Sequence, residues 1–447
     1  MSGVLSKKLN YSDKAPHALP SESVMMKCLP VSGSTFGSGS TIRIMIPHRA
    51  GCYLKPDSYL SFTVNNGSAT YTVTPDGCIS ALIQRLTVFQ GSQLISDVQN
   101  YNSFKNVLLD TQANPFQRTN GSLAIMMGTG NDYADAGTAA ANIVGSRGGQ
   151  IIPVSSSRDY STVLVNAVLG SSASKYIPLG KLNDGIIIEI TLASFANAFV
   201  ARTAAGVVSD AATLSAVVQQ TLSDSITINN VFFTANCVQL GDVAESLVQR
   251  MPDQGIFEIA SKDWKIYNGA VADGASGTSV LLPARFQSVS TILGWMHEDV
   301  LQNNFRMRYL TSRARNNLAS YQFRINGLPF PPWPVSCSGN GSQAYAELER
   351  TINSLTSTLH TVSLTQSEWV MDEDATRGAF VIGANLDTLA FAQEQPVFNG
   401  TKTSDGNCFI DLTFSAVGAA HAGKLFAAVQ YDTVLVVDGE GNLSCRW

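Results

Sequence analysis

Residues 321–335 read YQFRINGLPFPPWPV, a stretch that begins like a β-strand and ends in a segment that cannot complete a β-ladder. Apolar and polar residues alternate through YQFRI, and Asn326-Gly327 supplies the chemistry of a tight hairpin turn. Four prolines then follow within six residues, around Phe330 and Trp333. Because proline has no N–H to donate, we expect the second arm of this hairpin to lie at the edge of a sheet.

The same order of features occurs in the first half of the chain. Residues 85–95, RLTVFQGSQLI, predict a strand, a turn at Gly91 and a second short strand. In both halves an amphipathic helix is predicted next, over 97–112 in the first half and over 344–357 in the second. Gly91 and Gly327 lie about half the chain apart, so the sequence predicts a duplicated β domain.

Period-two alternation in short runs is the dominant pattern, and turn residues separate the runs. This pattern predicts an all-β fold, either a sandwich or a barrel. The predicted strands include 58–64, 161–169, 185–193, 225–233, 321–325, 360–366, 408–414 and 424–437.

Helix signals are few, and three long loops are expected. Asp97 is the expected N-cap of the helix over 97–112. A third helix, over 241–251, is expected to connect the two halves and to end before Pro252. The stretches read as long surface loops are 117–150, 198–222 (with a short helix as an option) and 268–280. The predicted organisation is an arm over 1–24, a first β domain over 25–240, a connector over 241–255 and a second β domain over 256–447.

Composition limits the possible functions. The chain has 447 residues, 45% of them hydrophobic, which is enough for a large core. Only 14% are charged, against roughly 25% in an average soluble protein. Uncharged polar residues must therefore cover most of the surface, which suits a protein packed against copies of itself. The net charge of −5 argues against a dedicated nucleic-acid binder.

Targeting and redox signals point to an intracellular protein. The opening MSGVLSKKLN lacks the apolar run of a signal peptide, and no run of about 18 apolar residues predicts a membrane span. The seven cysteines are odd in number and scattered, which is typical of reduced thiols.

The order of several segments resembles one protein family, the double jelly-roll major capsid proteins of tailless icosahedral DNA viruses. This is the adenovirus-like and tectivirus-like lineage, with polinton-like viruses and virophages nearest. Two segments resemble the first barrel, namely CYLKPDSYLSFTVNN and SALIQRLTVFQGSQLISDVQNYNSFKNVLLDTQ. Two more resemble the closing strands of that barrel and the link to the second one, namely YIPLGKLNDGIIIEITLA and ITINNVFFTANCVQLGDVAESLVQR. RFQSVSTILGW, SYQFRINGLPFPPWPV and KLFAAVQYDTVLVVDGEGNL resemble the second barrel. The resemblance covers most of 41–442.

The resemblance implies two tandem jelly-roll β-barrels with a few short helices and long surface loops. It further implies a homotrimeric, pseudo-hexameric capsomer that tiles an icosahedral shell around the genome, in a virion assembled inside the host cell. The implied partners are two further copies of the chain, neighbouring capsomers and minor or penton capsid proteins. An internal membrane is a further candidate partner, and sequence-specific nucleic acid is not expected.

Subunit contacts are the expected functional sites. Phe330, Pro331, Pro332 and Trp333 are candidates because exposed aromatic residues beside proline often mark recognition sites. Burial within their own barrel edge is the competing interpretation.

Two groups of basic residues are further candidates. Arg306, Arg308, Arg313 and Arg315 are predicted either to meet a neighbouring subunit or to lie on a solvated loop, with nucleic acid less favoured. For Lys7, Lys8 and Lys14 in the N-terminal arm, contacts with neighbours or a membrane and an ordinary frayed terminus both stay open.

No pattern of catalytic residues, resident metal or cofactor is found, so we expect a non-enzymatic protein. His48 and Cys52 form a close pair without the further ligands that zinc needs. The acidic turn at 372–374 lacks EF-hand spacing, although weak calcium binding stays open. Glu189 is expected on the polar face of its strand. Two rival classes are a carbohydrate-binding β-sandwich, such as a spike or lectin, and a β-sandwich hydrolase with a carboxylate pair.

Overall fold

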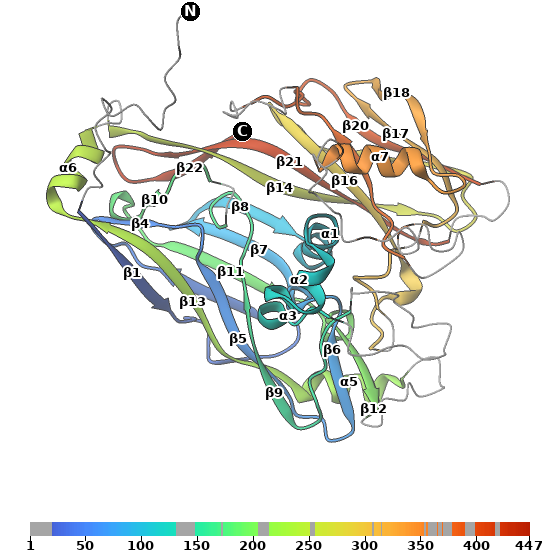
Figure 1. Cartoon of the computed structure of the whole chain (residues 1–447), viewed down its shortest axis with the longest axis horizontal. Coiled ribbons are helices and arrows are strands. Elements are labelled where there is room, and N and C mark those ends of the chain that lie inside the picture. The colour runs from blue at the N-terminus through green and yellow to red at the C-terminus, as the bar shows by residue number, and fades with distance from the viewer. Residues whose placement is uncertain are drawn as a thin grey trace, which may run out of the picture.

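The computed structural model describes residues 20–130, 148–170, 173–203, 214–250, 255–305, 308–313, 315–352, 355, 364, 369, 378–388, 398–415 and 421–447. Within these ranges the chain forms two β-barrels that lie side by side, the first coloured blue to green and the second yellow to red in Figure 1. Each barrel is built from a larger and a smaller antiparallel sheet.

The larger sheet of the first barrel is organised around β13, the last strand of that barrel. β13 pairs with β1, β2, β4 and β5, β5 pairs in turn with β9, and β4 with β10. The smaller sheet has the order β3-β11-β7-β8, and β6 and β12 form a separate ribbon. The bounds are β1 Ser21–Cys28, β2 Thr35–Phe36, β3 Thr41–Ile46, β4 Cys52–Leu54, β5 Tyr59–Asn66, β6 Tyr71–Pro75, β7 Ile83–Gln90, β8 Gln93–Gln99, β9 Ser156–Thr162, β10 Ile177–Pro178, β11 Ile186–Leu192, β12 Phe199–Thr203 and β13 Ile226–Leu240.

The second barrel repeats this arrangement. Its larger sheet has the order β14-β21-β16-β19, with β22 also paired to β21, and its smaller sheet has the order β15-β20-β17-β18. The bounds are β14 Phe257–Val271, β15 Gly277–Leu282, β16 Val289–Glu298, β17 Leu318–Ile325, β18 Leu328–Ser336, β19 Ile382–Asn385, β20 Cys408–Phe414, β21 Gly423–Val437 and β22 Leu443–Arg446.

The two barrels correspond strand by strand and in the same chain order. In the smaller sheets β3, β11, β7 and β8 match β15, β20, β17 and β18. In the larger sheets β1, β13, β5 and β9 match β14, β21, β16 and β19. Two sheets of four principal strands in this order make a jelly roll. The predicted duplication and the all-β, double jelly-roll class are therefore confirmed.

The proline-rich stretch forms β18, which lies at the edge of its sheet as predicted. Phe323 stands opposite Phe330 and Tyr321 opposite Val335, so four residues of β18 face Gln322 alone. Three of these four are prolines, which have no N–H for a ladder. The bulge thus places these prolines at positions where β18 makes no ladder hydrogen bonds with β17.

A helix follows the edge hairpin in each barrel, although the predicted bounds were wrong. α1 (Tyr101–Gln112) begins later than expected, because Asp97 belongs to β8 and binds Arg85 there, with Nε 2.6 Å from Oδ1. α7 (Ser342–Thr351) begins earlier and ends earlier than predicted. The expected helix between the barrels is α6 (Asp242–Arg250). The other helices are η2 Ile79–Leu82, α2 Pro115–Thr119, α3 Ser122–Met127, η3 Leu179–Lys181, α4 Phe195–Ala198, α5 Ala216–Ser225 and η5 Asp299–Leu301.

Two further predictions are corrected. The strand expected over 161–169 stops at Thr162, because the Asn166 side chain accepts the backbone N–H groups of Val168 and Leu169 in a turn. The loop expected over 268–280 is a hairpin, since β14 and β15 occupy most of it.

Parts of other predictions lie outside the described residues. Within the stretch predicted as a loop over 117–150, the described part holds α3 and the end of α2, and 131–147 lies outside. The prediction of a loop over 198–222 is wrong in part, because the stretch holds β12 and, as the optional helix, the start of α5; 204–213 lies outside. Of the strand expected over 360–366, only residue 364 is described. Within the described ranges, every helix falls short of what a membrane-spanning helix requires.

Candidate assembly surfaces

The contact between the two barrels centres on α1, which lies between them in Figure 1. Its Phe104 ring contacts Trp264 of β14, with ring centroids 4.8 Å apart. Its Ser103 hydroxyl lies 2.6 Å from His297 Nε2 and accepts a hydrogen bond from Trp295 Nε1 at 2.7 Å. His297 and Trp295 both come from β16, whose ten residues are all buried. α1 therefore covers part of the second barrel's larger sheet.

The edge strand β8 and its hairpin extend this contact. Gln90, at the tip of the hairpin, donates to the Gly441 carbonyl at 2.9 Å and accepts the Leu443 N–H at 2.8 Å. Lys265 of β14 lies 3.4 Å from the Asp97 carboxylate of β8. The first barrel thus presents its β8 edge and α1, and the second barrel presents β14, β16 and the start of β22.

A buried charge cluster joins the barrels beside α1. The Asp110 carboxylate, on α1, binds the guanidinium groups of both Arg118 and Arg313, and all three side chains are fully buried. Arg118 belongs to the first barrel and Arg313 to the second. Breaking a buried ion pair by removing one partner is costly because the other charge stays in a medium of low polarity.

A second buried carboxylate, Asp76, holds the same loop of the second barrel. It accepts the Leu310 N–H and the Thr311 hydroxyl, each at 2.5 Å. Burial raises the pKa of Asp76 above its ordinary value, while the positive charge of Arg308 opposes this. Residues 310–313 are therefore fixed by two carboxylates from the other barrel.

These contacts overturn the solvated-loop interpretation of the arginine cluster. Arg308, Arg313 and Arg315 are 4%, 0% and 5% exposed. Their side chains lie inside the folded chain, so they are not on its free surface to meet a neighbouring subunit. Arg306 lies outside the described residues. The spacing of the charges in the sequence did not indicate that the arginines are buried, since Asp110, the partner of Arg313, lies 203 residues away from it.

In the proline–aromatic segment of β18, some residues are buried within the barrel and others are exposed as a subunit contact would require. Pro331 is buried and Phe330 is partly buried against the core, which fits a role within the barrel. Pro332 is exposed and Trp333 is 55% exposed. A subunit contact at Trp333 stays a prediction. Lys7, Lys8 and Lys14 lie outside the described residues.

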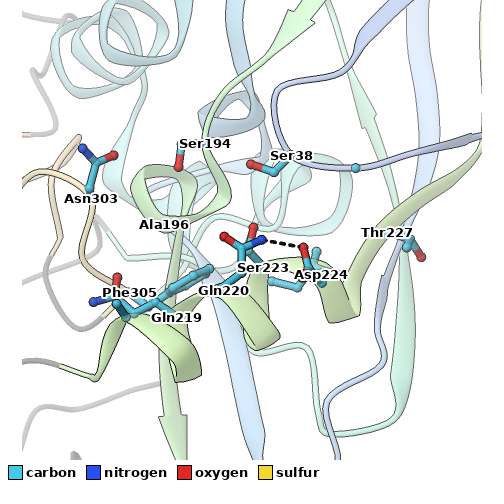
Figure 2. Close-up of a pocket in the computed structure, with 13 residues that line it drawn as sticks. Ser38, Ser194, Ala196, Gln219, Gln220, Ser223, Asp224, Thr227, Asn303 and Phe305 are labelled. Atoms are coloured by element: carbon cyan, nitrogen blue, oxygen red, sulfur yellow. Dashed lines mark hydrogen bonds between the residues drawn. The ribbon is translucent and has the colours of Figure 1, made fainter.

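A surface hollow of about 710 Å³ lies where α5 meets segments of both barrels, and Figure 2 shows its lining. Ser38 and Ser194 come from the first barrel, while Asn303 and Phe305 come from the second. Among the described residues that line it, Asp224 is the one ionisable side chain, and it accepts a hydrogen bond from Gln220 at 2.8 Å. Such a lining offers hydrogen bonds but no nucleophile paired with a base.

The other chemical candidates are also placed. Of the close pair, His48 is exposed and Cys52 is buried, and within the described ranges no group of His, Cys, Asp and Glu is arranged to hold a metal. The acidic turn at 372–374 lies outside these ranges. Glu189 is partly exposed between buried neighbours, on the polar face of β11 as expected. All seven cysteines are free thiols.

His297 makes the stability of the protein sensitive to acid. Burial, with a contribution from the Arg313 charge, lowers its pKa to about 3 from an ordinary 6.5. Below pH 6.5 the unfolded chain therefore binds a proton that the folded chain does not bind until about pH 3. From His297 alone we expect the free energy of unfolding to fall by up to about 1.4 kcal/mol for each pH unit below pH 6.5.

Urea titrations between pH 7 and pH 4 check this expectation. Asp263 works in the opposite direction, because burial raises its pKa to about 6 and the folded chain binds that proton first. The His297→Gln variant isolates the histidine and is expected to show a weaker acid dependence than the wild type. His48→Gln, at an exposed histidine, should keep the wild-type slope; equal slopes in all three proteins would contradict the assignment.

Comparison with known proteins gives similarity in structure only. No family model matches the sequence, and a search of curated proteins finds no match. The PBCV-1 capsid protein VP54, as fitted into a reconstruction of the virophage Sputnik, is similar with a TM-score of 0.63 and 11% identity over 98% of this chain and 99% of that one. The Faustovirus major capsid protein has a TM-score of 0.55 and 10% identity over 97% and 92%. The mavirus major capsid protein has a TM-score of 0.53 and 11% identity over 100% and 96%.

These similarities extend across both barrels and nearly the whole length of each chain. The fold of this protein is thus the double jelly roll of the major capsid proteins of virophages and other viruses.

Proposed function

We propose that this protein is a viral major capsid protein, which forms homotrimeric, pseudo-hexameric capsomers that tile an icosahedral shell around a genome. The observation that carries the proposal is the presence of two jelly rolls with one strand order in a single chain. Three such chains in a ring present six similar barrels, so a threefold assembly acquires the outline of a hexagon. Hexagonal units are what a closed shell requires over most of its area.

The joined barrels support this role. Buried contacts through α1, Asp110 and Asp76 hold the two barrels in one orientation. A closed ring needs a constant angle between neighbouring barrels, so the two barrels of one chain must be held at a fixed angle. The 14% content of charged residues also favours a surface that contacts other protein over one that stays in water.

The proposed partners follow from this role. They are two further copies of the chain, neighbouring capsomers, minor or penton proteins at the vertices and an internal membrane, all within a virion. The proposed role is structural rather than enzymatic. The similarity across both barrels favours it over a carbohydrate-binding β-sandwich, which would need only one.

Light scattering on the purified protein, followed by negative-stain electron microscopy, tests the proposal. We expect a particle of three times 47.7 kDa, or a larger assembly built from it, with a hexagonal outline in projection. A monomer at every concentration, with no hexagonal particles, would refute the proposal. Glycan binding by such a monomer would favour the carbohydrate-binding alternative.

A further inference from the structure

The contact between the barrels within one chain identifies which surfaces face the next chain. In that contact the first barrel contributes β8 and α1, and the second contributes β14 and β16. By the strand correspondence, the counterparts of β8 and α1 in the second barrel are β18 and α7. The counterparts of β14 and β16 in the first barrel are β1 and β5. Among the described residues, none of the hydrogen bonds, ion pairs and ring contacts identified between the barrels involves either counterpart surface.

We propose that β18 and α7 of one subunit seat on β1 and the outer face around β5 of the next subunit, repeating head to tail the contact that joins the two barrels. This inference rests on the proposed trimer and specifies its interface. A head-to-tail contact of this kind forms a ring when its rotation closes. In Figure 1, β18 and β1 lie at opposite ends of the molecule, as a ring of this kind requires.

The β18 surface has the exposed apolar residues expected of an interface. Leu328 is 72% exposed and Trp333 is 55% exposed, although both belong to a strand in which two other residues are buried. Tryptophan is among the residues that contribute most to binding energy when it is buried at the centre of an interface.

The β1 surface also carries exposed apolar residues, like the β18 surface. Met25 on β1, with Leu29 and Val31 just after it, are 65%, 60% and 67% exposed. β1 pairs with β13 along its whole length, but no strand among the described residues pairs with its other side. Clustered exposed apolar side chains along an unpaired edge mark a surface that another protein covers.

A hollow on the outer face of the first barrel lies where α7 is expected. Ser61 and Thr63 of β5 alternate with core residues and therefore point outward, where they bind Ser161 and Asp159 of β9 at 2.7 Å and 2.6 Å. With Lys27 and Phe232 they line a hollow of about 500 Å³. In the second barrel α1 occupies the corresponding face, against Trp264 and Trp295.

Cross-linking of introduced cysteines tests the proposal on the full chain. The native thiols are a low background, since six are buried and Cys445, the partly exposed one, is replaced by serine. Met25→Cys and Trp333→Cys are introduced separately and together, and the proteins are treated with a short bis-maleimide. We expect the double variant to give covalent dimers and trimers on a denaturing gel. Each single variant should stay monomeric, and a reassembled mixture of the two should give dimers only.

The control pair is Met25→Cys with Val300→Cys, since Val300 is 66% exposed and belongs to η5, which is part of neither proposed contact surface. Dimers from Met25→Cys alone, or equal linking of the control pair, would overturn the head-to-tail arrangement. Light scattering distinguishes failure of the proposed interface from failure of the proposed trimer. Because Trp333→Cys also removes the tryptophan side chain, the linking is judged at a protein concentration at which the double variant is trimeric. A trimeric double variant that does not link would overturn this interface and leave the capsomer proposal standing, whereas a wild-type protein that is monomeric at every concentration would overturn both.

Discussion

Replacing Asp110 by asparagine is expected to lower the free energy of unfolding by about 3–5 kcal/mol, although the substitution hardly changes the shape of the side chain. The variant removes the negative charge and leaves the guanidinium groups of Arg118 and Arg313 fully buried. Because Arg313 belongs to the other barrel, we also expect the two barrels to separate more readily. Urea unfolding followed by tryptophan fluorescence, with limited proteolysis of the connection between barrels, measures both effects.

Asp405→Asn is the matched control for this prediction. Asp405 binds Lys402 at 2.8 Å, but both side chains are more than half exposed. An exposed pair of this kind contributes little to stability, because water screens the two charges. Similar small losses in the two variants would show that the cluster around Asp110 does not hold the barrels together.

Replacing Trp333 by alanine is expected to raise the dissociation constant of the assembled protein by about 30-fold or more, which corresponds to about 2 kcal/mol at a central interface residue. The stability of the single folded chain should change little, because the side chain is 55% exposed there. Sedimentation at a series of concentrations gives the first quantity, and urea unfolding of the dissociated chain gives the second.

Val300→Ala serves as the control for Trp333, since it also truncates an exposed apolar residue of the second barrel. We expect it to leave both the assembly and the chain unchanged. If Trp333→Ala reduces the stability of the single chain as much as that of the assembly, the tryptophan acts within its own barrel, which was the competing interpretation of this segment.

Much of the fold can be predicted from the sequence because it depends on local patterns. Alternation located β5, β11, β20 and β21, and the two hairpins before α1 and α7 showed the duplication. The errors also have local causes. The apolar run at 161–169 looks like a strand, but Asn166 folds its second half into a turn. Asp97 fits the pattern of a helix cap, yet its partners Arg85 and Lys265 place it on a strand edge.

The contact between the barrels could not be predicted in the same way, because its partners are remote in sequence. Ser103 and His297 are 194 residues apart, and a lone serine or histidine carries no local signal. The arginines at 308–315 look like a charged loop until their carboxylate partners are known. Trp333 differs in part, since the neighbouring prolines predicted its place on an edge strand, while exposure and burial of its side chain were both left open.

The covalent joining of the two barrels has a kinetic consequence for the proposed ring of three chains. Half of the six contacts between barrels are completed as each chain folds, at the high effective concentration of an intramolecular reaction. Only two productive collisions between separate molecules are then needed to bring three chains together, instead of the five that six independent barrels would need. Because one chain contains both kinds of barrel, they are always made in equal numbers. Assembly of a ring is therefore never left incomplete because one kind of barrel is lacking.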